Sequence, residues 1–156
     1  MPNLKKASFK YNLIGDVDKL ANYAGLEELF LEGNEIDCID ALCVLGRLKL
    51  LDLTDNQITS IKVPHGVTAF AGLTCLCLER NYIQQCSFLG EFHGLQDIYL
   101  GNNLLTQEHS NIYSLKRLQN LVILDLSNNP LCEIEHFKLF TVYHLSKLKV
   151  TRLSFD

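Results

Sequence analysis

The sequence predicts an α/β solenoid with a parallel β-sheet on the concave face, short helices or 3₁₀ turns on the convex face, and a C-terminal helical cap. The first observation is the pattern Leu48-Lys-Leu-Leu-Asp-Leu-Thr-Asp-Asn-Gln-Ile58, with apolar residues at places 1, 4, 6 and 11 and asparagine at place 9. The second is the return of this pattern along the chain, and the third is a different apolar spacing between its copies. One unit alone leaves its apolar side exposed, so the units must stack.

The pattern occurs six times, with first residues at positions 4, 26, 48, 73, 95 and 121. The first copy is the weakest, because Ala7 and Phe9 stand where the other copies carry Leu or Ile. The steps of 22, 22, 25, 22 and 26 residues lie within the roughly 20–29-residue period of leucine-rich repeats. We expect the two longer steps to carry insertions on the convex side, within residues 62–67 and 107–112.

Between the copies, apolar residues recur three apart, which is the spacing of a short helix or 3₁₀ turn with one buried side. These residues are Val17, Leu20 and Tyr23; Ile39, Leu42 and Leu45; Cys86, Leu89 and Phe92; and Ile112, Leu115 and Leu118. Each unit is therefore predicted to be a short strand, a turn and a short helix, with one continuous core between the strand layer and the helix layer.

An asparagine follows each predicted strand at place 9, as Asn12, Asn34, Asn56, Asn81, Asn103 and Asn129. A turn leaves backbone N–H and C=O groups without partners, and one buried side-chain amide can satisfy several of them. We interpret these asparagines as structural residues and not as ligands of a bound molecule.

The segment that follows Asn129 departs from the pattern. It reads as a longer amphipathic helix that includes Phe137 and leads into a final strand near Val150. The last unit of a solenoid would otherwise expose its core, so we assign a cap to about residues 132–152. The whole chain, residues 1–156, is then expected to be a single repeat domain.

The sequence carries no assembled catalytic motif. No nucleophile elbow, zinc-protease motif or phosphate-binding loop is present. Cys75 and Cys77 form a C-x-C pair, but a zinc site needs a second pair of ligands and none accompanies it. The net charge of −4 argues against direct contact with nucleic acid, which requires a basic surface. We therefore expect no enzyme activity, no cofactor and no metal.

The cysteines and the hydropathy of the chain predict the cellular environment of the protein. The six cysteines are scattered through the repeats, and no Asn-x-Ser/Thr glycosylation motif occurs. The first residues lack the basic-then-apolar layout of a secretory leader, and no run of eighteen apolar residues is present. These observations favour a reducing, intracellular environment, with no contact with a membrane. We expect a cytoplasmic location, with nuclear and ciliary locations left open.

Strand alternation places the polar residues of each unit on the concave face. This face is mainly acidic: Arg80 is its one basic residue from the second copy to the sixth, and the first copy adds Lys6 and Lys10. Exposed aromatic side chains among carboxylates suit protein binding, because aromatic anchors supply interface energy while charges steer the approach. We predict that this face binds a basic, partly apolar protein segment, helix or folded domain. The predicted binding residues are Glu28, Phe30, Glu32, Asp52, Asp55, Cys77, Glu79, Tyr82, Asp97, Tyr99 and Asp125.

The 22-residue frame, joined to Asn129-Pro-Leu-Cys132 and a Phe-rich cap, resembles the intracellular Sds-type leucine-rich repeats over essentially the whole chain. That group includes a nuclear regulatory subunit of protein phosphatase 1, an axonemal dynein light chain and the A-prime protein of a spliceosomal particle. The alternation of short and long repeats also resembles one block of a ciliary protein built from several repeat blocks. The resemblance implies a non-enzymatic scaffold or regulatory subunit. Two alternatives stay open: a structural block of a larger ciliary or axonemal protein, and a ribonucleoprotein assembly factor.

Two features depart from this group. The cap continues from Val150 into Thr151-Arg152-Leu-Ser-Phe-Asp156, where the group has Leu-Asp. No capping segment precedes the strand that begins near Leu4, so the first repeat is expected to present an exposed edge. Such an edge can pair with further repeats, with a partner or with a second copy of the chain.

Overall fold

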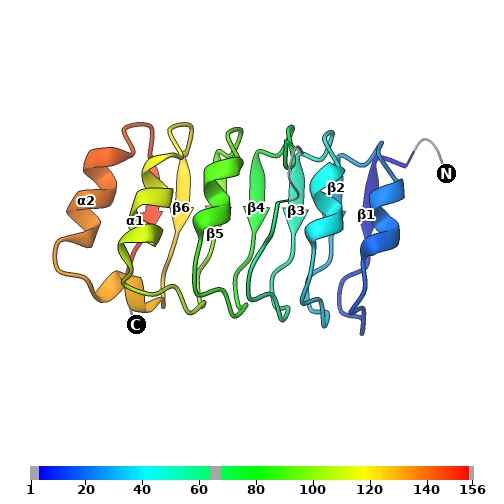
Figure 1. Ribbon diagram of the computed structural model, residues 1–156, viewed down its shortest axis with the longest axis horizontal. Helices are drawn as coiled ribbons and strands as arrows, with labels where there is room; N and C mark the ends of the chain where they lie inside the picture. The colour runs from blue at the N-terminus through cyan, green and yellow to red at the C-terminus, as the bar shows by residue number, and fades with distance from the viewer. Residues whose placement is uncertain (1–3, 64–67, 155–156) are drawn as a thin grey trace.

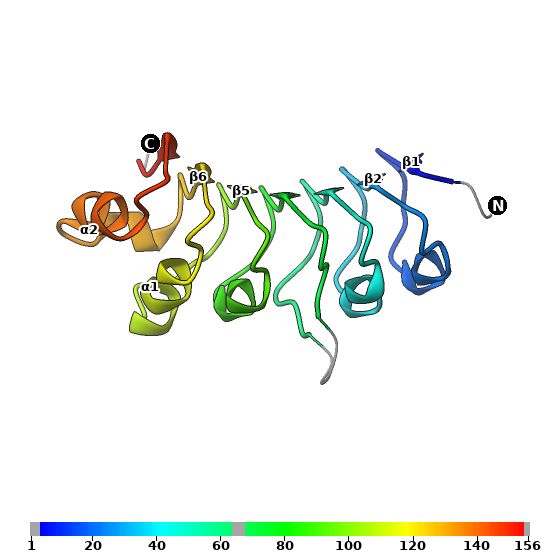
Figure 2. The same cartoon turned by 90° about the horizontal axis from the view of Figure 1, so that it is seen from above.

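The structure, a computed structural model, describes residues 4–63 and 68–154. In this part of the chain, seven strands form one sheet in sequence order, and neighbouring strands run parallel. The strands are β1 (Lys6–Ser8), β2 (Glu28–Phe30), β3 (Leu50–Asp52), β4 (Cys75–Cys77), β5 (Asp97–Tyr99), β6 (Ile123–Asp125) and β7 (Val150–Arg152). The sheet lines the inner side of a curved array and the helices lie outside it (Figures 1 and 2). The predicted fold class is confirmed.

The register of the sheet follows the sequence pattern. Each of the first six strands starts at place 3, so Glu28 pairs with Leu50 and Leu50 with Cys75. In β2 to β5 the middle residue is buried and the two flanking residues are partly exposed. Strand side chains alternate between the two faces, and this sends one row into the core and the other onto the concave face.

The convex side carries short helical segments where the three-residue spacing predicts them. They are the 3₁₀ helices η1 (Asp18–Asn22), η2 (Asp40–Val44) and η3 (Ser87–Glu91) and the α-helix α1 (His109–Lys116). The third repeat has no helix among its described residues, and residues 64–67 of the first predicted insertion lie outside them. The second predicted insertion, residues 107–112, runs into α1 on the convex side (Figure 2).

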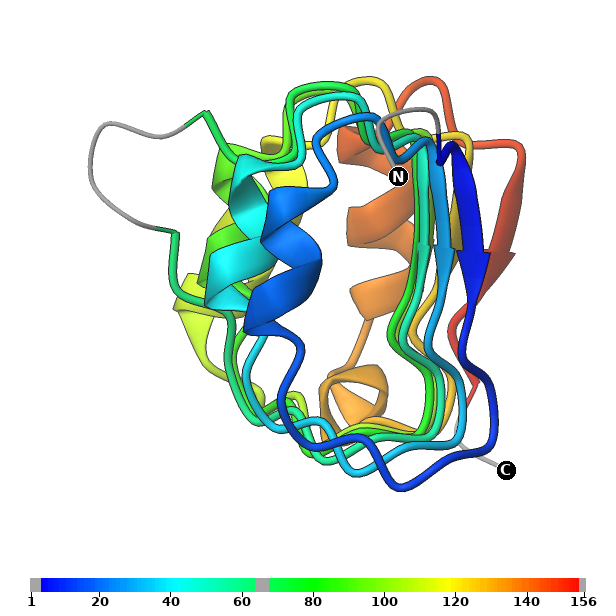
Figure 3. The ribbon, with the colours of Figure 1, turned by 90° about the vertical axis from the view of Figure 1, so that its right-hand side faces the viewer.

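The end-on view shows the strand layer and the helix layer facing each other (Figure 3), and one continuous core of buried side chains lies between them. Its centre is the row of fully buried place-4 residues, which includes Leu29, Leu51, Leu76 and Leu124. Because each leucine packs against its counterparts in the neighbouring repeats, the hydrophobic gain requires stacking. No helix in the described part of the chain is long and apolar enough to cross a membrane.

The cap differs from the single longer helix that the sequence predicts. It consists of the 3₁₀ helix η4 (Pro130–Glu133) and the α-helix α2 (Phe137–His144). His136 lies between them with a left-handed backbone, φ 63°, which interrupts the helix. Phe137 and Thr141 of α2 are buried, so this helix covers the end of the core as predicted (Figure 2).

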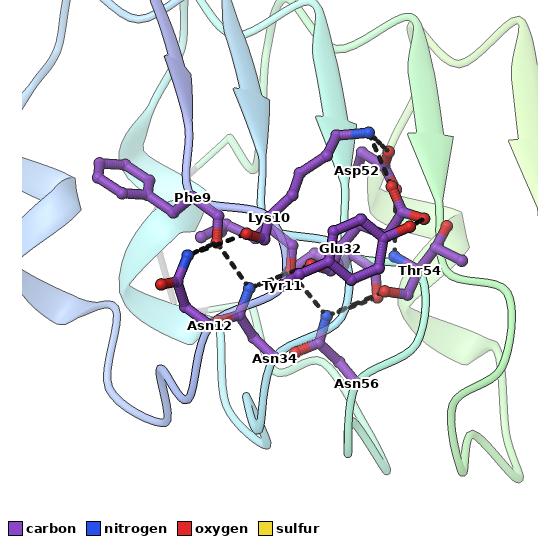
Figure 4. A network of polar contacts seen from close by, with 11 residues as sticks. Phe9, Lys10, Tyr11, Asn12, Glu32, Asn34, Asp52, Thr54 and Asn56 are labelled. Atoms are coloured by element: carbon purple, nitrogen blue, oxygen red, sulfur yellow. Dashed lines mark hydrogen bonds and ion pairs between the residues drawn. The ribbon is translucent and has the colours of Figure 1, made fainter.

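The asparagines that follow the strands form a hydrogen-bond ladder between repeats (Figure 4). The Asn56 side-chain nitrogen donates to the Leu53 carbonyl of its own repeat and to the Leu31 carbonyl of the preceding repeat, both at 3.0 Å. Its oxygen accepts the Ile36 N–H at 3.0 Å. The same three contacts recur at Asn34, Asn81, Asn103 and Asn129. The predicted structural role of these five asparagines, here called the asparagine ladder, is confirmed.

A left-handed residue precedes each asparagine at place 9. These residues are Tyr11, Gly33, Asp55, Arg80, Asn102 and Asn128, with φ between 53° and 66°. Side chains with a Cβ are strained in this conformation by about 1–2 kcal/mol. The strain is tolerated because the turn brings the following asparagine under the preceding repeat, where its amide satisfies three or more backbone groups.

The substitution Asn81→Ala should lower the free energy of unfolding by about 1–3 kcal/mol, because buried backbone groups lose their partners. Asn81 is buried and bonds to Leu53, Leu78, Glu79 and Ile58. Urea unfolding followed by circular dichroism measures the change. Asn12→Ala is the matched control, because the bonds of the exposed Asn12 side chain to described residues all lie within its own repeat. Equal losses in the two variants would contradict the ladder.

Candidate protein-binding face

The predicted binding residues lie along the concave side of the sheet, on and just after β2 to β6. Ten of the eleven are at least partly exposed, and Asp125 is the exception. Their environments divide the face into an N-terminal part with three ion pairs and a central part whose carboxylates have no such partner among the described residues. The two parts therefore differ in how many of their carboxylates are free of ion pairs.

In the N-terminal part, lysines of the first repeat neutralise the predicted carboxylates. Lys6 Nζ lies 2.6 Å from Glu28, and Lys10 Nζ lies 2.7 Å from Glu32 and 3.4 Å from Asp52. The Tyr11 hydroxyl also donates a hydrogen bond to Glu32 (Figure 4). The bond from Lys10 lowers the pKa of Glu32, so this carboxylate is ionised and already paired at neutral pH. Glu28, Glu32 and Asp52 thus present little free negative charge.

Phe30 is enclosed by the same lysines. The Lys6 and Lys10 ammonium groups lie 4.9 and 5.0 Å from the centre of its ring, within the range of a cation–π contact. The ring is half-buried beneath them. A partner must displace these lysines before it can pack on Phe30, a constraint that the sequence pattern does not reveal.

The central part is defined here as the central patch: Asp55, Cys77, Glu79, Asp97 and Tyr99. Cys77 pairs with Tyr99 in the sheet, and Glu79 follows Cys77 on the same chain segment. Among the described residues, no hydrogen bond or ion pair reaches the half-buried Glu79 carboxylate. Burial, reinforced by the negative charge of Asp125, raises the pKa of Glu79. Tyr82, with 54% of its surface exposed, follows two residues after Arg80.

Asp125 is buried, and its prediction as an exposed binding residue is wrong. Its carboxylate accepts hydrogen bonds from the Ser127 N–H at 3.0 Å, the Ser127 hydroxyl at 2.6 Å and Arg152 Nη1 at 3.2 Å. Only 3% of its side chain is exposed. The sequence pattern assigns Asp125 the same place as Phe30 and Tyr99, but β7 of the cap pairs beside it and brings Arg152 over the carboxylate.

A shallow hollow of about 140 Å³ lies between β5 and β7 on the concave side. Tyr99, Asp125, Val150 and Arg152 are among its lining residues. Val150 and Arg152 lie outside the predicted binding residues, because the sequence places them in the cap. The two residues are two positions apart, and side chains at this spacing lie on the same side of a strand.

Two cysteines of β4 lie side by side on the concave side. A hydrogen bond between the two thiols lowers the pKa of Cys75 and raises that of Cys77. Both are free thiols and both are half-buried. No group of three or more His, Cys, Asp or Glu side chains in the described part of the chain is arranged to hold a metal ion.

The repeats, their register and the cap define the class of this protein. A family model described as leucine-rich repeat matches residues 6–155. The chain belongs to the leucine-rich repeat family.

Three relatives are 26% to 34% identical to this chain. Leucine-rich repeat-containing protein 43 from Homo sapiens is 34% identical over 140 residues, covering 86% of this chain and 21% of that protein. The protein phosphatase 1 regulatory inhibitor subunit PPP1R7 homolog from Arabidopsis thaliana is 29% identical, covering 78% and 38%. U2 small nuclear ribonucleoprotein A' from Candida albicans is 26% identical, covering 88% and 59%. The resemblance to the Sds-type group is confirmed.

The solved structures agree with the fold. An internalin (inlF) from Listeria monocytogenes superposes with a TM-score of 0.73 at 27% identity, covering 91% of this chain and 39% of that one. The chain spans less than two thirds of the length of each relative described above.

The substitution Glu79→Gln should raise the free energy of unfolding at pH 7 by up to about 1 kcal/mol, the scale for a partly exposed carboxylate. The raised pKa means that the ionised carboxylate is less favourable in the folded chain than in the unfolded chain. The gain should shrink as the pH falls through the raised pKa, because native Glu79 is then protonated. Urea unfolding at pH 7 and pH 4 measures both effects. Glu91→Gln, at an exposed convex position, should change neither value, and a gain that persists at pH 4 would contradict the assignment.

The substitution Asp125→Ala should lower the free energy of unfolding by about 1–3 kcal/mol, because Ser127 and Arg152 lose their shared acceptor. Asp97→Ala is the control, since Asp97 is half-exposed one strand away and receives no side-chain hydrogen bond from the described residues. Thermal unfolding compares the two variants. Similar losses would mean that the Asp125 contacts contribute little.

Proposed function

We propose that this protein is a non-enzymatic interaction module, a scaffold or regulatory subunit, that binds a basic and partly apolar protein segment on its concave face. The binding centre is the central patch, and Tyr82 lies beside it. Glu28, Phe30, Glu32 and Asp52 form a flank that the lysines of the first repeat partly neutralise. The module is one repeat domain over residues 1–156, acts in the cytoplasm, and contacts nucleic acid only through protein partners.

The observation that carries this proposal is the unpaired, half-buried carboxylate of Glu79. Burial raises its pKa, the charges of Arg152 and Arg80 oppose this rise only in part, and no described residue forms an ion pair with its carboxylate. A lysine or arginine of a partner would provide that ion pair in a desolvated setting, where charge-assisted hydrogen bonds are strongest. Asp55 and Asp97 add negative potential that steers a basic segment towards this centre.

Tyr99 and Tyr82 provide the apolar part of the proposed site. Tyr99 is half-buried and lines the hollow beside β7, and Tyr82 is more than half exposed. Tyrosine combines a large apolar ring with a polar tip and is enriched at positions that dominate binding energy. The relatives support an interaction role, because one is named as a phosphatase regulatory subunit and another as a component of a ribonucleoprotein.

The proposal is tested by affinity capture from cell lysate with the native chain and with the double variant Glu79→Lys, Tyr99→Ala. Proteins that bind the central patch should be retained by the native chain and lost by the variant. Once a basic partner segment is identified, Tyr99→Ala alone should weaken its binding by about 1–3 kcal/mol, as for an interface anchor.

The control carries the same charge reversal on the convex side, Glu91→Lys, and should capture the same proteins as the native chain. Circular dichroism of each variant separates loss of binding from loss of folding. If the double variant retains the same partners as the native chain, the central patch is not the binding site.

A further inference from the structure

The helix layer carries a hollow of about 320 Å³ between α1 and the cap. The two helices α1 and α2 lie side by side in both ribbon views (Figures 1 and 2), and the core separates them from the concave face. Ligand pockets have volumes of about 300–1,000 Å³ and mainly apolar walls with a few polar groups. This hollow meets both conditions. Its lining residues are Tyr113 and Lys116 of α1 and Ile134, Glu135, His136, Phe137 and Phe140 of the cap.

The turn between η4 and α2 forms one wall of the hollow. His136 has a left-handed backbone, φ 63°, and it separates Ile134 from Phe137. Residues other than glycine rarely adopt this conformation, and strained backbones of this kind cluster at binding sites. His136 does not precede an asparagine of the ladder, so the ladder does not account for its conformation.

The half-buried Lys116 joins the two helices that flank the hollow. Its Nζ lies 5.3 Å from the centre of the Tyr113 ring and 5.1 Å from the centre of the Phe140 ring, within the range of a cation–π contact. Among the described residues, no carboxylate forms an ion pair with this ammonium group. The ring faces attract the ammonium group but carry no net charge, so its charge is not neutralised.

The Phe30 cluster on the concave face shows which group completes such an arrangement. There, Lys10 Nζ lies 5.0 Å from the centre of the Phe30 ring and also 2.7 Å from the Glu32 carboxylate. The cluster around Lys116 has the rings and the ammonium group, but no described residue supplies the carboxylate. A ligand with a carboxylate beside an apolar group would supply the missing partner and fill the hollow.

The charges around the hollow favour such an acidic ligand. Glu135 is 90% exposed, and its carboxylate lies 3.3 Å from Nε2 of the neighbouring His136 and not beside Lys116. The His144 ring packs on Phe140 with their centres 4.4 Å apart. Desolvation, reinforced by the charge of Lys116, lowers the pKa of His144, so His144 is neutral at pH 7. The permanent positive charge of the lining residues is therefore that of Lys116.

We propose that this hollow binds a partner protein segment in which an aromatic residue stands next to an acidic residue. The aromatic side chain packs in the hollow against Tyr113 and Phe140, and the carboxylate pairs with Lys116. Aromatic rings contribute a large buried area and favourable edge-to-face contacts, and charge-assisted hydrogen bonds are stronger than neutral ones. The site lies in the helix layer, takes negative charge, and does not rest on the function proposed above.

The probe for this site is a fluorescent peptide with the sequence Gly-Ser-Glu-Phe-Glu-Ser-Gly. Fluorescence anisotropy should show saturable binding to the native chain. A peptide with alanine in place of phenylalanine should bind at least about tenfold more weakly, because it lacks the anchor that fills the hollow. A peptide with glutamine in place of both glutamates should show a similar loss, because it lacks the partner of the ammonium group.

Two variants of the chain test the walls of the hollow. Lys116→Gln removes the charge, and Tyr113→Ala removes a ring that is 64% exposed, so neither change empties the core. Each should weaken binding of the probe at least about tenfold. The matched controls are Lys19→Gln on η1 and Tyr143→Ala on α2, which lie outside the lining of the hollow and should leave binding unchanged. Circular dichroism checks that each variant is folded.

A charge exchange makes the test specific. Lys116→Glu should lose the probe and should bind the peptide in which lysine replaces both glutamates, whereas the native chain should not bind that peptide. A variant that had only lost its fold would bind neither peptide. The exchange therefore tests the ion pair with Lys116 directly.

Four outcomes would overturn the proposal. The first is no saturable binding of the probe to the native chain at millimolar concentration. The second is binding that Lys116→Gln and Tyr113→Ala both leave unchanged, which would place the peptide elsewhere. The third is equally tight binding of N-acetylphenylalanine, which would assign the hollow to a free aromatic carboxylate. The fourth is self-association of the native chain that Tyr113→Ala removes, measured by sedimentation, which would assign the hollow to a second copy.

Discussion

The asparagine ladder is the interaction on which the rest of the structure depends. Each inner amide bonds to carbonyls of two successive repeats and to one N–H, so it fixes the register of its repeat against the preceding one. The register brings the fully buried leucines of place 4 into one row and the polar residues of places 3 and 5 onto the concave face. A one-residue slip would exchange these two rows and expose the core. The ladder therefore supports both the core and the binding face.

On the concave face, the stacking of repeats decides which carboxylates form ion pairs. A carboxylate at a given place meets whatever the neighbouring repeat carries about 22 residues away, and long lysine side chains reach across strands. Glu32 meets Lys10 and Tyr11, whereas Glu79 meets no such partner among the described residues. The available acidity is therefore confined to the central patch. Under the proposed function, the basic groups of a partner meet this patch, where desolvated ion pairs contribute most.

The two ends of the solenoid differ in how far their core is covered by the described residues. At the C-terminal end, α2 covers the core, and β7 carries exposed residues on both faces. At the N-terminal end, the described residues leave a hollow lined by Phe9, Ile14 and Leu20 uncovered, and they bond to the Asn12 side chain only at the Phe9 and Lys10 carbonyls of its own repeat.

The sequence by itself determined the repeat length, the strand positions, the buried rows and the role of the inner asparagines. These features follow from a local periodicity that recurs in each repeat. Tertiary structure alone decided which side chains are exposed on the concave face. Asp125 is buried because Arg152 of the cap lies over it, Phe30 is covered by Lys6 and Lys10, and His136 breaks the cap helix. Buried Asn111 binds the preceding repeat at Cys86, although it lies outside the repeated frame. Such contacts join residues more than twenty positions apart, and their partners depend on side-chain reach across the assembled sheet, which no single repeat encodes.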